Sequence, residues 1–153
     1  MAIQTDLDGT ITLYCGDSGE LTIDGLFVPE YKIIKVETGT DDDGEPIYEE
    51  QITDEILNPR NFNVYWEVQD AKRNVIFVVE RTNNGKPSVT LPLTSTNSDK
   101  LVVPINKKSE NYYYGVKACE VGTSNEDTLF VGGKTYGELN LIVVYPKQAE
   151  GNV

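Results

Sequence analysis

The sequence predicts an all-β protein, an antiparallel β-sandwich, with a jelly roll as the alternative architecture. Short runs of β-branched and aromatic residues recur along the 153 residues, separated by clusters of Gly, Asn, Asp and Pro. No stretch of ten or more residues has the apolar spacing of an amphipathic helix. Residues 111–146 place three strand-like runs so close together that no helix fits between them, which is typical of a sandwich.

The first strands should lie within residues 10–37. Residues 10–15 alternate between polar and apolar side chains, and the turn residues of 16–19 close this run. Further strand-like runs follow at residues 20–23, 26–29 and 31–37.

An acidic segment near residues 38–56 interrupts this series. Residues 39–44 are polar and cannot be buried, so we expect a loop tip there. Residues 47–51 favour a short strand followed by a helical turn, which the Asn58-Pro59 pair would end. We therefore expect one domain over residues 1–153, with a short N-terminal arm and this acidic loop.

The strongest strand signals lie in the second half of the chain. Val64, Trp66 and Val68 alternate with more polar residues, so they should share the core-facing side of a strand over residues 63–69. Other strands are expected at residues 75–81, 112–120, 127–131 and 139–145. Proline-containing strands, which belong at sheet edges, are expected at residues 89–93 and 101–105.

The charge, the N-terminal sequence and the cysteines of the chain limit the classes of function that it can have. The chain has 25 acidic and 13 basic residues, a net charge of −12, which repels phosphate backbones and anionic lipids. We therefore expect no nucleic-acid or membrane partner. The N-terminus lacks the basic start and apolar core of a signal peptide, so we expect synthesis in a cytoplasm without export by the general secretion route. In a reducing compartment, Cys15 and Cys119 should be free thiols, with a disulfide as the alternative.

Histidine is absent, which removes the commonest general base and the commonest metal ligand. We therefore expect no catalytic residue, no cofactor and no metal. The enzyme alternative is Asp6-Leu-Asp-Gly-Thr10, which matches the first motif of haloacid-dehalogenase-type phosphatases. That chemistry needs a buried parallel strand before the aspartates, and residues 1–5 are short and half polar, so a turn is the favoured interpretation. Residues 41–45 resemble part of a calcium loop but lack flanking helices, so we expect a solvated loop.

Candidate contact residues come from tyrosines and acidic side chains. In a strand, Tyr112 and Tyr114 point to one face and Tyr113 to the other, so the first two should be core. Tyrosine is enriched in protein interfaces. We predict an interface at Tyr31, Tyr113, Asp41, Asp42 and Asp43.

Three segments together resemble the N-terminal module of upper baseplate proteins in siphophages of Gram-positive hosts. They are residues 21–23 after the Gly16-Asp17 turn, residues 63–70 continuing to Asn74-Val-Ile-Phe77, and Tyr-Tyr-Tyr-Gly-Val-Lys-Ala-Cys119 with Asp127-Thr-Leu129. The resemblance covers roughly residues 10–145 and implies an immunoglobulin-like antiparallel β-sandwich that is a non-enzymatic virion part. Two departures stand out: no helical stalk or heptads follow the module, and the acidic insertion has no counterpart.

The resemblance implies a bacteriophage virion protein, a tail or baseplate adaptor that docks on the particle and supports host adhesion. The expected partners are other phage virion proteins, namely a baseplate hub or the major capsid protein, and the expected assembly is a homo-oligomer such as a trimer. Two alternatives stay open: a capsid decoration or head-fibre protein, and a carbohydrate- or receptor-binding module that uses exposed aromatics.

Overall fold

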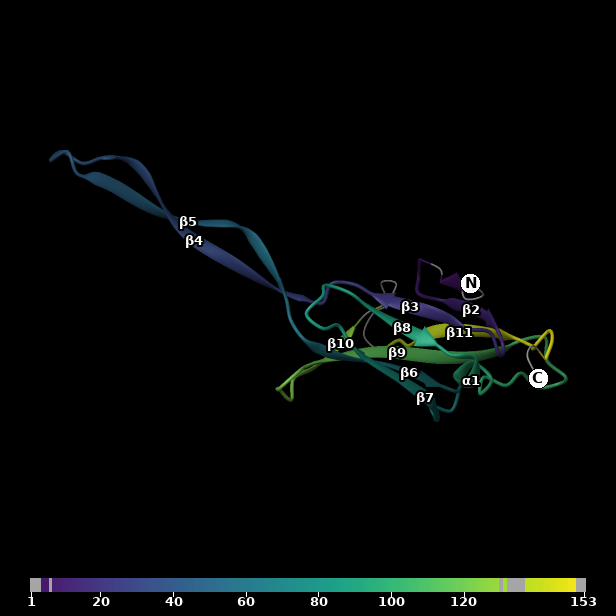
Figure 1. The fold of residues 1–153 in the computed structure, drawn as a ribbon. Coiled ribbons are helices and arrows are strands. Elements are labelled where there is room, and N and C mark those ends of the chain that lie inside the picture. Colours follow the sequence, from purple (N-terminus) through teal and green to yellow (C-terminus); the bar gives the residue numbers. More distant parts are fainter. Residues whose placement is uncertain (1–3, 6, 130, 132–136, 151–153) are drawn as a thin grey trace.

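The protein consists of a β-sandwich and a long hairpin that projects from it (Figure 1). The computed structural model describes residues 4–5, 7–129, 131 and 137–150, with the backbone alone at 4–5, 27–32 and 52–59. The all-β sandwich class that the sequence predicts is confirmed.

One layer of the sandwich is a seven-stranded sheet in which β9 is central. Its strands run in the order β1-β2-β11-β9-β6-β7, with β10 also paired to β9. Their bounds are β1 Gln4–Thr5, β2 Ile11–Tyr14, β6 Phe62–Gln69, β7 Val75–Thr82, β9 Glu110–Glu120, β10 Glu126–Leu129 and β11 Asn140–Tyr145. Neighbouring strands are antiparallel except β2 and β11, which are parallel.

The second layer is smaller. It consists of β3, Gly19–Ile23, paired antiparallel with β8, Val89–Leu93. A single helical turn, α1 at Ser95–Ser98, follows β8, and the Thr94 hydroxyl caps it by accepting from the Asn97 N–H at 3.1 Å. This turn lies at the end of the sandwich opposite the projecting hairpin (Figure 1).

The core fills the space between the two layers. Val64, Trp66 and Val68 are buried, as their alternation predicts, and Leu91 faces them from the smaller layer. Each fully buried aliphatic side chain of this kind contributes roughly 1.5–3 kcal/mol. Alternation therefore identifies the core correctly on the central strands.

Tyr112 and Tyr114 also belong to the core, and Tyr113 between them is half-buried on the outer face. The Tyr114 hydroxyl donates to the Gly9 carbonyl oxygen at 2.6 Å. The Tyr114 ring meets Trp66 edge to face, with 5.9 Å between ring centroids. The predicted opposite orientation of neighbouring tyrosines is confirmed.

Three sequence-based expectations about elements are wrong. Residues 101–105 are not a strand: Leu101 is buried alone, while Val102 and Ile105 are exposed and the chain turns at residues 104–107. No helical turn follows residues 47–51, because the whole of Pro46–Pro59 is one strand. The expected strands at 26–29 and 31–37 merge into one, Phe27–Thr40. The acidic insertion is therefore loop only at residues 41–45.

Candidate interaction surfaces

The hairpin arm is formed by β4, Phe27–Thr40, and β5, Pro46–Pro59, which pair antiparallel from Phe27↔Pro59 to Thr40↔Pro46. It extends away from the sandwich as a twisted two-stranded ribbon (Figure 1). At about 3.3 Å per residue, its fourteen-residue strands give a reach of roughly 45 Å. A two-stranded ribbon without a packed face is only marginally stable in water, so this arm gains most from a partner.

The tip of the arm is a tight acidic turn. The Asp41 carboxylate accepts hydrogen bonds from the backbone N–H groups of Asp43 and Glu45, each at 2.9 Å. Gly44 has φ +83°, a conformation that glycine adopts without strain. Asp42 and Asp43 are exposed and extend beyond the turn. The tip therefore presents fixed negative charge at the point farthest along the arm.

Charge is unevenly distributed along the arm. Residues 27–59 contain ten acidic residues against two lysines, so most of the protein's net charge of −12 lies there. Within β4, Lys32 and Lys35 balance Glu30 and Glu37. The remaining eight acidic residues, with no basic residue among them, are Asp41, Asp42, Asp43, Glu45, Glu49, Glu50, Asp54 and Glu55. One strand of the arm is thus neutral, whereas the other strand and the tip are strongly acidic.

Both faces of the arm expose apolar side chains. In the register of the ribbon, paired residues share a face, so Ile33 and Tyr48 lie on one side and Ile34 and Ile47 on the other. Ile33 is 63% exposed and Tyr48 57% exposed. On one short ribbon these four exposed side chains lie close together, and neighbouring exposed apolar groups of this kind favour a contact surface more than single ones do. Each face of the arm is a mixture of apolar and acidic groups.

Buried polar contacts fix the base of the arm to the sandwich. Asn83 is 2% exposed; its Nδ2 donates to the Arg60 and Lys86 carbonyl oxygens, and its Oδ1 accepts from the Phe62 N–H at 2.8 Å. On the entering strand, Leu26 is buried and its N–H donates to the Pro87 carbonyl oxygen at 2.9 Å. Both ends of the arm are therefore held against the same β7–β8 turn.

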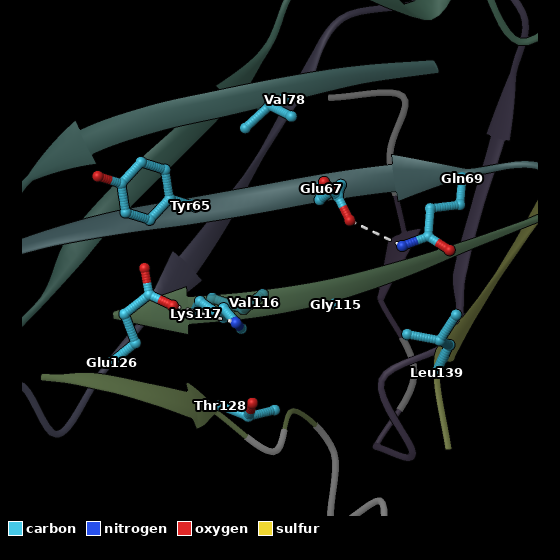
Figure 2. Close-up of a pocket in the computed structure, with 10 residues that line it drawn as sticks. All are labelled: Tyr65, Glu67, Gln69, Val78, Gly115, Val116, Lys117, Glu126, Thr128 and Leu139. Carbon is cyan, nitrogen blue, oxygen red and sulfur yellow. Dashed lines mark hydrogen bonds and ion pairs between the residues drawn. The ribbon is translucent and has the colours of Figure 1, made fainter. Parts of the chain in front are cut away.

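A second surface is a hollow of about 500 Å³ on the outer face of the large sheet (Figure 2). It lies where β9 changes partner: β11 pairs with β9 up to Tyr114, and β10 pairs from Val116 onward. Gly115 lies between them and contributes no side chain, which leaves the space open. The hollow therefore results from the change of strand partner along β9 and from the missing side chain at Gly115.

The lining of the hollow combines one aromatic ring with polar groups. Tyr65 lies at one end and Leu139 at the other (Figure 2). Gln69 donates to the Glu67 carboxylate at 2.7 Å, and Lys117 pairs with Glu126 at 3.2 Å. An aromatic ring beside fixed hydrogen-bonding groups is suited to a small polar ligand with a flat apolar face.

The phosphatase-like segment adopts a different context from the one its chemistry requires. β1 and β2 pair antiparallel, so residues 7–10 form the turn of a hairpin rather than the end of a parallel strand. The Asp8 carboxylate accepts from the Thr10 N–H at 2.9 Å. Gly9 has φ +83° and lies against Asn140, which leaves no room for a Cβ. Among the described residues, no group of three or more Cys, Asp or Glu side chains is placed to hold a metal.

The predicted interface residues fall on different surfaces. Asp41, Asp42 and Asp43 form the exposed tip of the arm, and the Tyr31 backbone pairs with Glu55 within it. The Tyr31 side chain lies outside the described residues. Tyr113 is on the outer face of the sandwich, beside Asp70 and Arg73 rather than on the arm. The hollow at Gly115 was missed; the signal available in the sequence was a glycine inside an alternating strand.

Comparisons with protein-family models, curated proteins and solved structures give no match to this chain. Within the described residues, no helix combines the length and the apolar character needed to span a bilayer.

Proposed function

We propose that this chain is a non-enzymatic structural protein of a bacteriophage virion, a tail or baseplate adaptor that docks on the particle and supports host adhesion. The hairpin arm is the observation that carries the proposal. A ribbon that projects from the body and, in its described part, exposes isoleucine on both faces and Tyr48 on one of them is suited to contact with another protein.

The sandwich provides the rigid base that such an adaptor needs. Its core is continuous across both layers, and Asn83 and Leu26 fix the arm to it at one turn. A load transferred through the arm therefore reaches a packed sheet rather than a loop. The likeness of residues 10–145 to the siphophage baseplate module adds the virion setting, with a baseplate hub or the major capsid protein as docking partner and a homo-oligomer such as a trimer as the assembled form.

Within the virion class, a capsid decoration or head-fibre protein is the second placement, since an arm could equally lie across a shell of capsid subunits. Gold-labelled antibodies on purified particles, combined with cryo-electron microscopy, separate the two. Density at the tail tip supports the adaptor, and regular density over the head supports decoration. Absence of the chain from particles would refute the virion proposal.

The hollow beside Tyr65 favours a second function, a carbohydrate- or receptor-binding module. Tyrosine can stack on the flat face of a sugar while Glu67, Gln69 and Lys117 bind its hydroxyl groups. A glycan array with wild-type protein, Tyr65→Ala and the matched control Tyr48→Ala tests it. Binding that is lost only in Tyr65→Ala supports a sugar site; equal signals from all three proteins would contradict it.

A further inference from the structure

The strongest unexplained feature is the charge asymmetry of the hairpin arm. Its two strands have the same length, yet β4 is neutral and β5 with the tip carries only acidic charge. Solubility alone would not require this separation, because acidic residues on either strand would serve equally well. The asymmetry distinguishes one edge of the ribbon from the other.

Strand pairing leaves the outer edges of the ribbon open. β4 and β5 pair only with each other in the part of the chain that the structure describes, so each has an outer row of backbone N–H and C=O groups. On β4, the register shift between Glu37 and Gly39 interrupts this row, and Lys35 adds a positive charge. Residues 47–51 of β5 continue without such an interruption. The edge of β5 is therefore the better template for an added strand.

We infer that the arm binds a basic segment of a partner protein, which adds as a third strand along the outer edge of β5 and extends toward the acidic tip. This inference rests on the proposed function in taking the partner to be a protein of the particle. The added strand would carry adjacent pairs of lysine or arginine separated by pairs of apolar residues, because β5 presents Ile47 and Tyr48 and then Glu49 and Glu50, one of each kind on each face.

A second copy of the arm is a poor occupant of this edge. Pairing β5 with β5 would bring Glu49 and Glu50 of one chain close to the same acidic run of the other. Like charges on adjacent strands are destabilising. The complementary partner is thus basic, and its attraction should weaken as salt screens the arm, since the screening length is about 8 Å at physiological ionic strength.

A peptide probe tests the inference directly on the full-length protein. The probe is a ten-residue peptide that repeats Lys-Lys-Val-Val, so that each of its faces carries both kinds of side chain, and its control repeats Lys-Lys-Gly-Gly at the same charge. Residue-resolved amide exchange is measured with each peptide at low and high salt. We expect the Lys-Lys-Val-Val peptide to slow exchange at residues 47–51 of β5, with smaller effects on β4 and the sandwich. Equal effects of both peptides, or protection confined to the sandwich, would overturn the inference.

Two variants that lose the same number of charges separate the arm from general acidity. The arm variant carries Asp42→Asn, Asp43→Asn, Glu49→Gln and Glu50→Gln; Asp41 is kept because it holds the turn. The control variant carries Glu20→Gln, Asp24→Asn, Asp127→Asn and Glu150→Gln, all exposed positions on the sandwich or its C-terminal extension. We expect the arm variant, and not the control variant, to bind the peptide about tenfold or more weakly than the wild-type protein does.

Equal loss of binding in both variants would refute a specific edge site. Protection of residues 47–51 that rises with protein concentration without any peptide would also refute it, in favour of arm-to-arm pairing. Particle localisation is read separately. A chain that is found on particles but fails the peptide test leaves the virion proposal standing without this inference, whereas the reverse result leaves the edge site standing without a virion role.

Discussion

Asn83 is joined to the backbone of Phe62 by two hydrogen bonds, one through its buried side chain and one through its own backbone N–H. The Phe62 N–H donates to Asn83 Oδ1 at 2.8 Å, and the Asn83 N–H donates to the Phe62 carbonyl oxygen at 3.4 Å. This pair lies where the chain leaves the arm and enters the sheet at β6. Asn83 consequently links the arm to the sandwich, two parts of the protein that differ strongly in packing.

Asn83→Ala should destabilise the protein by about 1–3 kcal/mol, because it removes the buried amide that bonds the Phe62 N–H and the Arg60 carbonyl oxygen in part-buried positions. Urea unfolding measures the loss, and amide exchange should accelerate at residues 60–62. Asn84→Gly is the matched control: Asn84 is exposed with φ +52°, which glycine adopts readily, so little change is expected. Similar losses in both variants would contradict the role of Asn83.

Tyr114→Phe should cost about 1–3 kcal/mol, since it removes the hydroxyl that satisfies the buried Gly9 carbonyl oxygen while keeping the ring against Trp66. Tyr113→Phe, one residue away on the half-buried outer face, should change stability by less than about 0.5 kcal/mol. Thermal unfolding of the two variants provides the comparison. A larger loss in Tyr113→Phe would show that the outer face, and not the core, depends on a tyrosine hydroxyl.

Stability should fall in alkaline solution. Burial raises the pKa of Tyr114 well above its ordinary value of 10.0, and burial followed by the charge of Glu110 raises that of Tyr112. The unfolded chain therefore releases these protons first, so the contribution of each tyrosine is complete below about pH 10 and declines above it. The slope is at most about 1.4 kcal/mol per pH unit for each tyrosine. Urea titrations from pH 8 to 12 should show a smaller decline in Tyr114→Phe; an unchanged slope would contradict the assignment.

Both cysteines should react as free thiols, since neither forms a disulfide in the structure. Partial burial, followed by the Asp99 carboxylate, raises the pKa of Cys15, so its thiolate is scarce near neutral pH. In Cys119→Ser protein, we expect slow reaction with Ellman's reagent, and faster reaction once Asp99→Asn is added. Fewer than two reactive thiols in the denatured, unreduced wild type would instead reveal a disulfide.

The sandwich should fold without the arm. Phe27 and Pro59 are paired neighbours at its base, so an Asn-Gly turn can join residue 26 to residue 60 in place of residues 27–59. The core residues of both layers all lie outside this segment. We expect the shortened chain to keep its near-ultraviolet circular dichroism and its melting temperature within a few degrees. Loss of cooperative unfolding would mean that the arm packs on the sandwich.

The sequence predicts those parts of the fold in which burial imposes alternation. Val64, Trp66 and Val68 identify β6 because every second residue must leave water. Strand β5 lacks that signal: it is held by pairing with β4 rather than by a core, and Glu49 and Glu50 interrupt any apolar period. Residues 101–105 show the opposite case, in which the sequence predicts a strand that the structure does not form. Their apolar run resembles a strand, although only Leu101 is buried.

Candidate contact surfaces were harder to predict, for a related reason. The acidic tip at Asp41, Asp42 and Asp43 is visible in composition, and the structure places it at the far end of the arm. The hollow depends on β10 and β11 meeting the same edge of β9 beside Gly115, and on β6, far from them in the chain, supplying Tyr65 to the lining. No local pattern encodes such a meeting.

Because both ends of the arm are fixed at one turn, its length is free to change without disturbing anything else. Adding or removing one residue pair shifts the tip by about 3.4 Å but exchanges the two faces, whereas two pairs restore them. Related proteins could therefore differ in the length of the arm, by inserting two residue pairs at a time, while each side chain stays on its own face of the ribbon. The distance that the hairpin reaches would then vary while the sandwich at its base stays the same.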